Sequence, residues 1–166
     1  SLVLLGSGPD ALPSPRADVL RLLRPVVEQA GLAAVADASD GSHWGGTPSQ
    51  ASFLTEALAD ADRKRGPQPA EVRAFLRERL LRGSAAALVA MADALLGEPD
   101  RVDALAATRV PVLVAHGEDD DAWSPAVQRV MADRLGAAYE VVPDALHSPA
   151  AENPDGTAKV LLAFWG

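Results

Sequence analysis

The sequence of 166 residues contains no cysteine, which excludes disulfide bonds, thiolate metal sites and a cysteine nucleophile. Aromatic residues make up only 4% of it, although 48% of its residues are hydrophobic. Any core must therefore pack mainly Ala, Leu and Val. No apolar run approaches the ~18–20 residues of a membrane helix, and the first residues do not resemble a signal peptide. We therefore expect a soluble, cytoplasmic protein that does not contact a membrane.

Basic side chains are also scarce. Fifteen Lys and Arg against 23 Asp and Glu give a net charge of 15 − 23 = −8. Proteins that bind nucleic acid present a basic face to phosphate, so we do not expect a nucleic-acid partner. The length suits one domain, or part of a domain with an attached subdomain.

Three short apolar runs predict strands, near residues 2–5, 110–115 and 138–142. Such runs are typical of strands that are buried on both faces in a parallel sheet. The last two alternate with helical segments, which predicts right-handed crossovers. The expected fold class is therefore α/β, with about three parallel strands and a helical insertion. A sheet of only three strands would leave apolar edges unpaired, which indicates part of a larger domain.

Helical segments fill most of the remaining sequence. Thr47-Pro48 and Ser124-Pro125 are N-cap signals followed by proline at the first helical position, and Gly136 ends the second of these helices. Pro25 should bend or divide the first helix. Helices are expected near 18–29, 47–65, 70–82, 84–96, 99–107, 124–135 and 154–164. The expected organisation is a core strand and loop at 1–13, a helical region at 14–98 and a C-terminal core at 99–166.

Acidic residues follow the second of these strands, and His147 follows the third. Open α/β sheets place their sites at the carboxyl ends of parallel strands, so one of Asp119, Asp120 and Asp121 could orient His147 as a general base. A solvated acidic turn is one alternative. A cation site is another, but calcium loops spread their ligands over ~12 residues and include a bidentate Glu. No such spread is visible here.

In the order of its predicted strands and helices and in its motifs, the sequence resembles the C-terminal part of an α/β-hydrolase. The run from Leu2 through Gly6-Ser-Gly-Pro9 is similar to the strand that follows the nucleophile helix, and residues 14–98 would be a helical cap. Gly117-Glu-Asp-Asp120 matches the family's Gly-x-x-Asp. The stretch from His147 to Pro154 is similar to the family's His-x-x-x-x-Glu-x-Pro. One departure is Leu146, where the family usually has glycine, which permits a positive φ.

The resemblance implies that Asp120 and His147 are catalytic. Asp121 is the second choice for the acid, because a proline follows it by four residues, as in the family. Trp44 is expected in a cap loop over the mouth of the active site. Trp123 is expected beside the acid cluster, and both tryptophans are predicted to contact substrate. The resemblance implies neither a cofactor nor a metal.

The family's nucleophile elbow, Gly-x-Ser-x-Gly, does not occur in the sequence. The resemblance therefore implies that an N-terminal segment of the same protein carries the serine and pairs with Leu2–Leu5. The implied function is Ser-His-Asp acyl transfer to water on a small ester, thioester, lactone or amide. A haloalkane dehalogenase with an Asp nucleophile, a lyase, a perhydrolase or a non-catalytic ligand-binding protein remains an alternative.

A dinucleotide site is a further alternative. Gly6-Ser-Gly8-Pro-Asp-Ala11 follows a strand and has the spacing of the phosphate-binding fingerprint. Pro9 removes an amide from the expected phosphate cradle, and Pro13 and Pro15 would break the helix that should follow at once.

Overall fold

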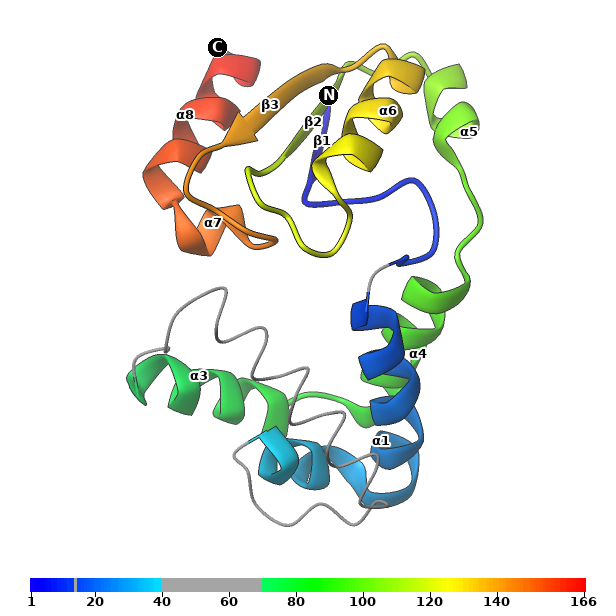
Figure 1. The fold of residues 1–166 in the computed structure, drawn as a ribbon, viewed down its shortest axis with the longest axis vertical. Helices are drawn as coiled ribbons and strands as arrows, with labels where there is room; N and C mark the ends of the chain where they lie inside the picture. Colours follow the sequence, from blue (N-terminus) through cyan, green and yellow to red (C-terminus); the bar gives the residue numbers. More distant parts are fainter. Residues whose placement is uncertain (14, 40–69) are drawn as a thin grey trace. The chain divides into compact units, whose positions relative to one another are not determined.

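The computed structural model describes residues 1–13, 15–39 and 70–166. These form parts of two compact units (Figure 1). The first comprises Ser1–Ser14 and Gly97–Gly166, and the second comprises Pro15–Leu96. The predicted divisions at 13/14 and 98/99 lie within two residues of these boundaries. Two predictions, the helix at 47–65 and the placement of Trp44, lie outside the described residues.

The first unit contains the predicted parallel sheet. Its strands are β1 (Leu2–Leu5), β2 (Val112–Gly117) and β3 (Ala138–Val142), in the order β1-β2-β3. Both pairings are parallel, with Leu2 opposite Val112 and Leu113 opposite Ala138. The α/β fold class and the three parallel strands are therefore confirmed.

The central strand β2 begins and ends two residues later than the predicted 110–115. Pro111 has no amide hydrogen to donate, and its carbonyl accepts from the Leu2 amide at 2.9 Å just ahead of the first pair. At the other end, His116 and Gly117 still pair with β3. The strand therefore carries a histidine inside the sheet, although periodicity placed it beyond the strand.

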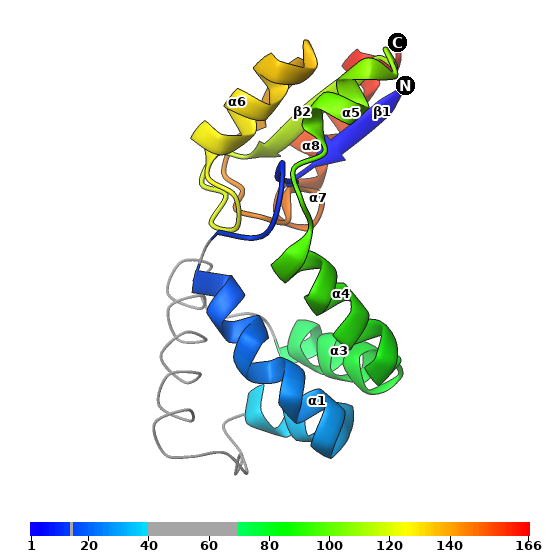
Figure 2. The same ribbon diagram turned by 90° about the vertical axis from the view of Figure 1, so that its right-hand side faces the viewer.

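Helices cover both faces of this sheet. Figure 2 shows α5 (Val102–Ala107) and α6 (Pro125–Leu135) on one side and α8 (Pro154–Trp165) on the other. The short α7 (Pro149–Glu152) precedes α8 and was not predicted. The core between α5, α6 and the sheet is aliphatic, as the composition predicted. Its buried members are Val102, Val112, Val114, Met131 and Ala132.

The boundaries of α6 follow its sequence signals. The Ser124 side chain accepts from the Val127 amide, Pro125 occupies the first turn, and Gly136 closes the helix at φ 61°. The helix therefore starts and stops where the sequence predicts. This fixes which side chains α6 turns toward the loop that follows β2.

The described part of the second unit is helical, with α1 (Pro15–Ser39), α3 (Ala70–Leu81) and α4 (Ala85–Gly97). Pro25 does not divide the first helix as predicted, because the non-helical residue inside α1 is Gly31 (φ 78°, ψ −177°); the predicted bend at Pro25 stays a prediction. Pro25 is exposed, whereas glycine has no Cβ to resist this backbone conformation. Arg24 pairs with Asp93 and so links α1 to α4.

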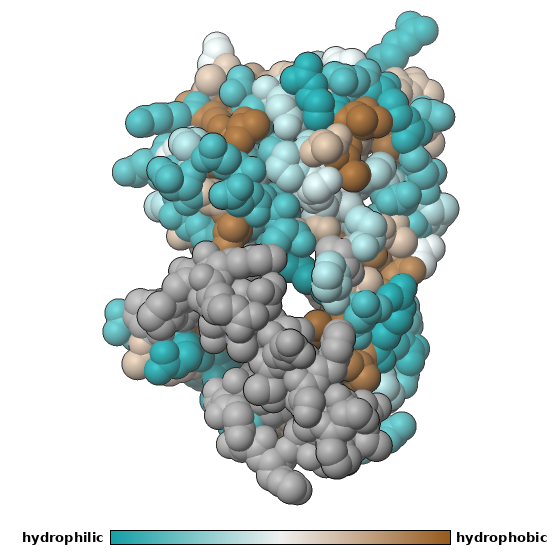
Figure 3. Space-filling view, in the orientation of Figure 1, coloured by the Kyte–Doolittle hydropathy of each residue, from teal (hydrophilic) through white to brown (hydrophobic). Residues whose placement is uncertain are grey.

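No single described helix is long and apolar enough to cross a membrane. The pair α3 and α4, bent by 100°, meets the length and composition criteria only when the two are taken together. On the surface of the first unit, Figure 3 shows apolar side chains in separate patches among hydrophilic ones. The large exposed apolar residues of that unit are Val110, Val130, Val141, Leu162 and Trp165.

Candidate functional site

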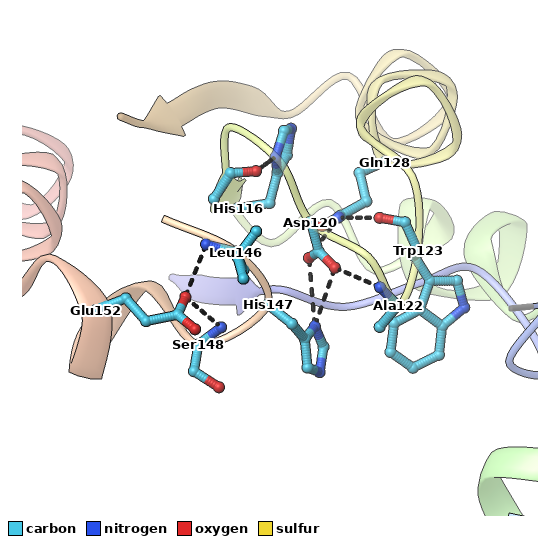
Figure 4. A network of polar contacts seen from close by, with 10 residues as sticks. His116, Asp120, Ala122, Trp123, Gln128, Leu146, His147, Ser148 and Glu152 are labelled. Carbon is cyan, nitrogen blue, oxygen red and sulfur yellow. Dashed lines mark hydrogen bonds and ion pairs between the residues drawn. The ribbon is translucent and has the colours of Figure 1, made fainter. Parts of the chain in front are cut away.

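The two predicted catalytic residues meet at the carboxyl ends of adjacent strands (Figure 4). Asp120 lies in the loop after β2, and His147 lies in the loop after β3. The His147 Nδ1 atom is 3.1 Å from Asp120 Oδ1 and 3.3 Å from Oδ2. The pair is therefore within the hydrogen-bonding distance expected of an acid that orients a histidine.

Two further donors hold the Asp120 carboxylate, whose side chain is completely buried. The Ala122 amide donates to Oδ1 at 2.9 Å, and Gln128 Nε2 donates to Oδ2 at 2.9 Å. Burial acts to raise the pKa of Asp120, but the hydrogen bonds from His147, Ala122 and Gln128 together outweigh it and lower this pKa. The stability that the carboxylate contributes is therefore present above its unfolded-state pKa and is lost as pH falls through the folded-state pKa.

This environment fixes the tautomer of His147. An ionised carboxylate only accepts hydrogen bonds, so Nδ1 carries the proton that points to Asp120. In the neutral ring, Nε2 then has a free lone pair and lies on the side of the ring away from Asp120. The His147 side chain is 25% exposed, so solvent or a reacting group can approach it. The pair can accept a proton at Nε2 and stabilise the resulting imidazolium.

A second carboxylate, that of Glu152 in α7, holds the loop that carries His147. Its Oε2 accepts from the Leu146 amide at 2.7 Å and from the Ser148 amide at 3.1 Å. These are the two amides that flank the histidine. The positive φ of this loop falls at Asp144 (51°) and not at Leu146, so the departure from the family's glycine imposes no strained backbone at that position.

Glycines allow the three loops to pack closely. A Cβ on Gly6 (φ 56°) would come within 2.9 Å of the His147 carbonyl oxygen, and one on Gly117 would overlap the Leu146 carbonyl. A Cβ on Gly8 would overlap the Trp123 ring.

The dinucleotide site that the sequence left open needs a helix that begins within its glycine turn. In the structure, the next helix α1 starts only at Pro15. The dinucleotide-site alternative is therefore contradicted.

Trp123 packs beside the pair. Its ring centroid is 5.9 Å from that of His147, with an interplanar angle of 49°. The residue is only 7% exposed, and its Nε1 is buried without a partner among the described residues. Little of its surface is open to a substrate, so its substrate contact stays a prediction.

Sequence reasoning missed two buried polar groups near the pair. Gln128 lies in a row with Met131, Ala132 and Leu135, on the face of α6 that packs inward. A polar residue in an apolar i, i+3, i+4, i+7 stripe signals a buried polar group that makes hydrogen bonds, so the burial of Gln128 could have been predicted.

The second missed group is His116, which is completely buried in β2. Its Nδ1 donates to the Gly117 carbonyl at 2.6 Å, so its Nε2 accepts from the Tyr139 hydroxyl at 2.6 Å. This bond ties β2 to β3 next to the acid loop. Arg129 lies over the Tyr139 ring.

Among the residues that the structure describes, no group of three or more His, Asp or Glu side chains is arranged to hold a metal ion.

Comparisons with known proteins identify the fold. No family model and no curated protein matches the chain. Among solved structures, it is similar to an esterase from Thermogutta terrifontis (22% identity, TM-score 0.66), covering 98% of this chain and 54% of that one. It is also similar to the enol-lactonase from Burkholderia xenovorans LB400 (23% identity, TM-score 0.65), covering 98% of this chain and 55% of the enol-lactonase. A third similar structure is MenH from S. aureus (17% identity, TM-score 0.65), where the match covers 98% of this chain and 57% of MenH.

These similarities establish that the chain has the fold of the C-terminal part of an α/β-hydrolase. It spans about half the length of the solved structures that it matches. The resemblance that the motifs indicated is therefore confirmed at the level of the fold. At this level, its structural relatives are hydrolase-like enzymes.

Replacing Glu152 with alanine should lower the free energy of unfolding by about 1 kcal/mol, because two loop amides lose an acceptor at an exposed position. Urea denaturation of the complete gene product measures this. Glu152→Gln should recover much of the loss, since its amide oxygen still accepts. Glu140→Ala, at an exposed position on β3, is the control. Equal losses for Glu152→Ala and Glu140→Ala would contradict the role of Glu152 in the loop.

Proposed function

We propose that this chain is the C-terminal part of a serine acylhydrolase that transfers an acyl group from a small ester, thioester, lactone or amide to water. The observation that carries the proposal is the 3.1 Å contact between His147 Nδ1 and buried Asp120 at the carboxyl ends of β2 and β3. The similarity to an esterase and an enol-lactonase supports the same class of chemistry. No cofactor is needed for this reaction.

In the proposed mechanism, a serine on an N-terminal segment attacks the substrate carbonyl. His147 Nε2 takes the hydroxyl proton as the Ser–acyl bond forms, and Asp120 stabilises the imidazolium. His147 then gives that proton to the leaving group as its bond to the acyl carbon breaks. Water repeats the sequence on the acyl-enzyme, so the acid is released and the serine regains its proton.

The open edge of β1 is the proposed docking point for that segment. Within residues 1–13, 15–39 and 70–166, β1 pairs only with β2. The amides of Leu2 and Gly6 donate toward β2. Alternate residues of a strand direct their backbone groups to opposite edges, so those of Val3 and Leu5 point the other way. We propose that the strand before the nucleophile lies there.

Residues 1–166 expressed alone should therefore fail to fold as a stable monomer. All four residues of β1 are apolar but only half-buried in this chain, and an exposed apolar strand edge favours pairing with another chain. Each large apolar side chain left unburied forgoes up to ~1.5–3 kcal/mol, against a typical domain stability of ~5–15 kcal/mol. Circular dichroism and sedimentation measure the result, and co-expression of the N-terminal part is the matched control, which should restore a folded complex. A soluble monomer with a sharp cooperative melt would show that β1 needs no neighbour.

A fluorophosphonate probe tests the nucleophile directly. The complete gene product should form one covalent adduct, located by mass spectrometry on a serine outside residues 1–166. The adduct should be lost on prior denaturation, because labelling depends on the assembled site. Failure to label an active protein would favour a carboxylate nucleophile, as in a dehalogenase. A protein that neither labels nor turns over esters would be a non-catalytic binding protein.

A further inference from the structure

Gln128 is a completely buried amide that contacts the acid of the proposed site. From the first turns of α6, its Nε2 donates to Asp120 Oδ2 at 2.9 Å and to the Trp123 carbonyl at 2.8 Å (Figure 4). Both hydrogens of one NH₂ group are therefore used within the loop between β2 and α6. One bond holds the carboxylate, and the other holds the backbone three residues later.

The orientation of this amide is determined by its neighbours. A flipped amide would place Oε1 against the carboxylate and the carbonyl, which are both acceptors. In the observed orientation, Oε1 is buried and has no partner among the described residues. A buried acceptor without a partner lowers stability, and a leucine of similar size would avoid that loss. A glutamine at this position is therefore explained by what its NH₂ group donates.

We propose that Gln128 is a positioning residue that fixes the Asp120 carboxylate for its bond to His147. The inference rests on the proposed function, because it assigns a role within that catalytic site. The carboxylate can rotate about its χ2 bond. Gln128 on Oδ2 and the Ala122 amide on Oδ1 stop that rotation from opposite sides and leave both oxygens facing His147 Nδ1.

In the part of the chain that the structure describes, the charged groups nearest to this amide lie on three elements. His147 is the titratable side chain that contacts Asp120 across the loops. Along the acid loop, Asp119 is exposed and Asp121 is partly exposed. On α6, Arg129 is exposed and pairs with Asp133. A change at Gln128 should therefore act mainly on Asp120 and, through it, on His147.

The first test is Gln128→Leu in the complete gene product. We expect kcat for p-nitrophenyl ester hydrolysis to fall about ten- to hundredfold with KM unchanged, the effect of removing one hydrogen bond to a charged group. Gln29→Leu, at an exposed position in α1, is the control and should leave kcat unchanged. A loss of less than twofold in a folded Gln128→Leu protein would overturn the proposal, as would a change confined to KM.

The second test is Gln128→Glu, which keeps the shape of the side chain and serves if the leucine variant does not fold. A carboxylic acid donates a hydrogen bond only while it is protonated. Two carboxyl groups this close hold one shared proton until the pH exceeds the raised pKa of the pair. The wild-type amide at position 128 has no proton to lose, so it adds no pH dependence to the rate. The rate of the variant should fall as pH rises above the raised pKa of the two carboxyl groups, because the introduced carboxylate then no longer donates to Asp120. A variant profile that superimposes on that of the wild type would overturn the proposal.

A nuclear magnetic resonance measurement separates failure of this inference from failure of the proposed function. We expect the Nδ1 proton of His147 to exchange slowly while the buried carboxylate of Asp120 holds it. Its signal should be present in the wild type and in Gln29→Leu, and should broaden or vanish in Gln128→Leu. If the wild type turns over no ester, the proposed function fails, and this signal alone decides the role of Gln128. An unchanged signal in Gln128→Leu would overturn that role.

Discussion

Replacing His147 with alanine in the complete gene product is expected to lower kcat for ester hydrolysis by about 10³–10⁶-fold, with KM little changed. In the proposed mechanism, His147 is the base, and the bond from its Nδ1 to Asp120 keeps the Nε2 lone pair free. Without it, the nucleophile keeps its proton, and only binding and electrostatic stabilisation remain. Initial rates on p-nitrophenyl esters measure the effect.

Added imidazole provides the control for this variant. It should restore part of the rate, because the alanine leaves a gap of the size of the ring in a partly exposed site. A variant that is merely misfolded would not respond to imidazole, and its thermal melt would also change. Near-wild-type rates without imidazole would rule out His147 as the base.

Replacing Asp120 with asparagine is expected to lower kcat by about 10⁴-fold at neutral pH. The asparagine NH₂ group would donate where the carboxylate accepts, so His147 Nδ1 would have to give up its proton and act as an acceptor. The proton would then sit on Nε2, which could no longer take one from the nucleophile. The rate on the same esters measures the change, and circular dichroism checks that the fold is retained.

Asp121→Asn is the matched control for the acid, because Asp121 is the adjacent carboxylate and the second choice from the sequence. It should retain a rate within a few-fold of the wild type, since Asp120 makes the contact with His147. If Asp121→Asn were instead the more damaging change, the acid would be Asp121 and the assignment would be wrong by one residue.

The strands and the spacing of the acid and histidine were predictable because both depend on local patterns. Apolar runs predict parallel strands, and the carboxyl ends of neighbouring strands meet at one edge of the sheet. The shift of β2 to Val112–Gly117 was harder to see, because His116 is polar and its burial depends on the Tyr139 hydroxyl of another strand. Such a pair is visible only once the sheet is assembled.

The supports of the site were less predictable. Glu152 and Gln128 act through bonds to groups six and eight residues away in the sequence, across turns whose shape no pattern gives. The roles of Gly6 and Gly8 depend on what a Cβ would meet in another loop. The sequence of α1 contains both a proline and a glycine that could interrupt the helix. The structure interrupts it at Gly31 and accommodates Pro25 at an exposed position within the helix.

The first unit is discontinuous in the sequence, since Pro15–Leu96 enters between its two segments. Every described side chain and amide that holds Asp120 or His147 belongs to those two segments. Among residues 1–13, 15–39 and 70–166, the supports of the Asp120–His147 pair are therefore encoded outside the inserted unit. We expect a chimera that carries a relative's insert to keep Asp120 and His147 paired.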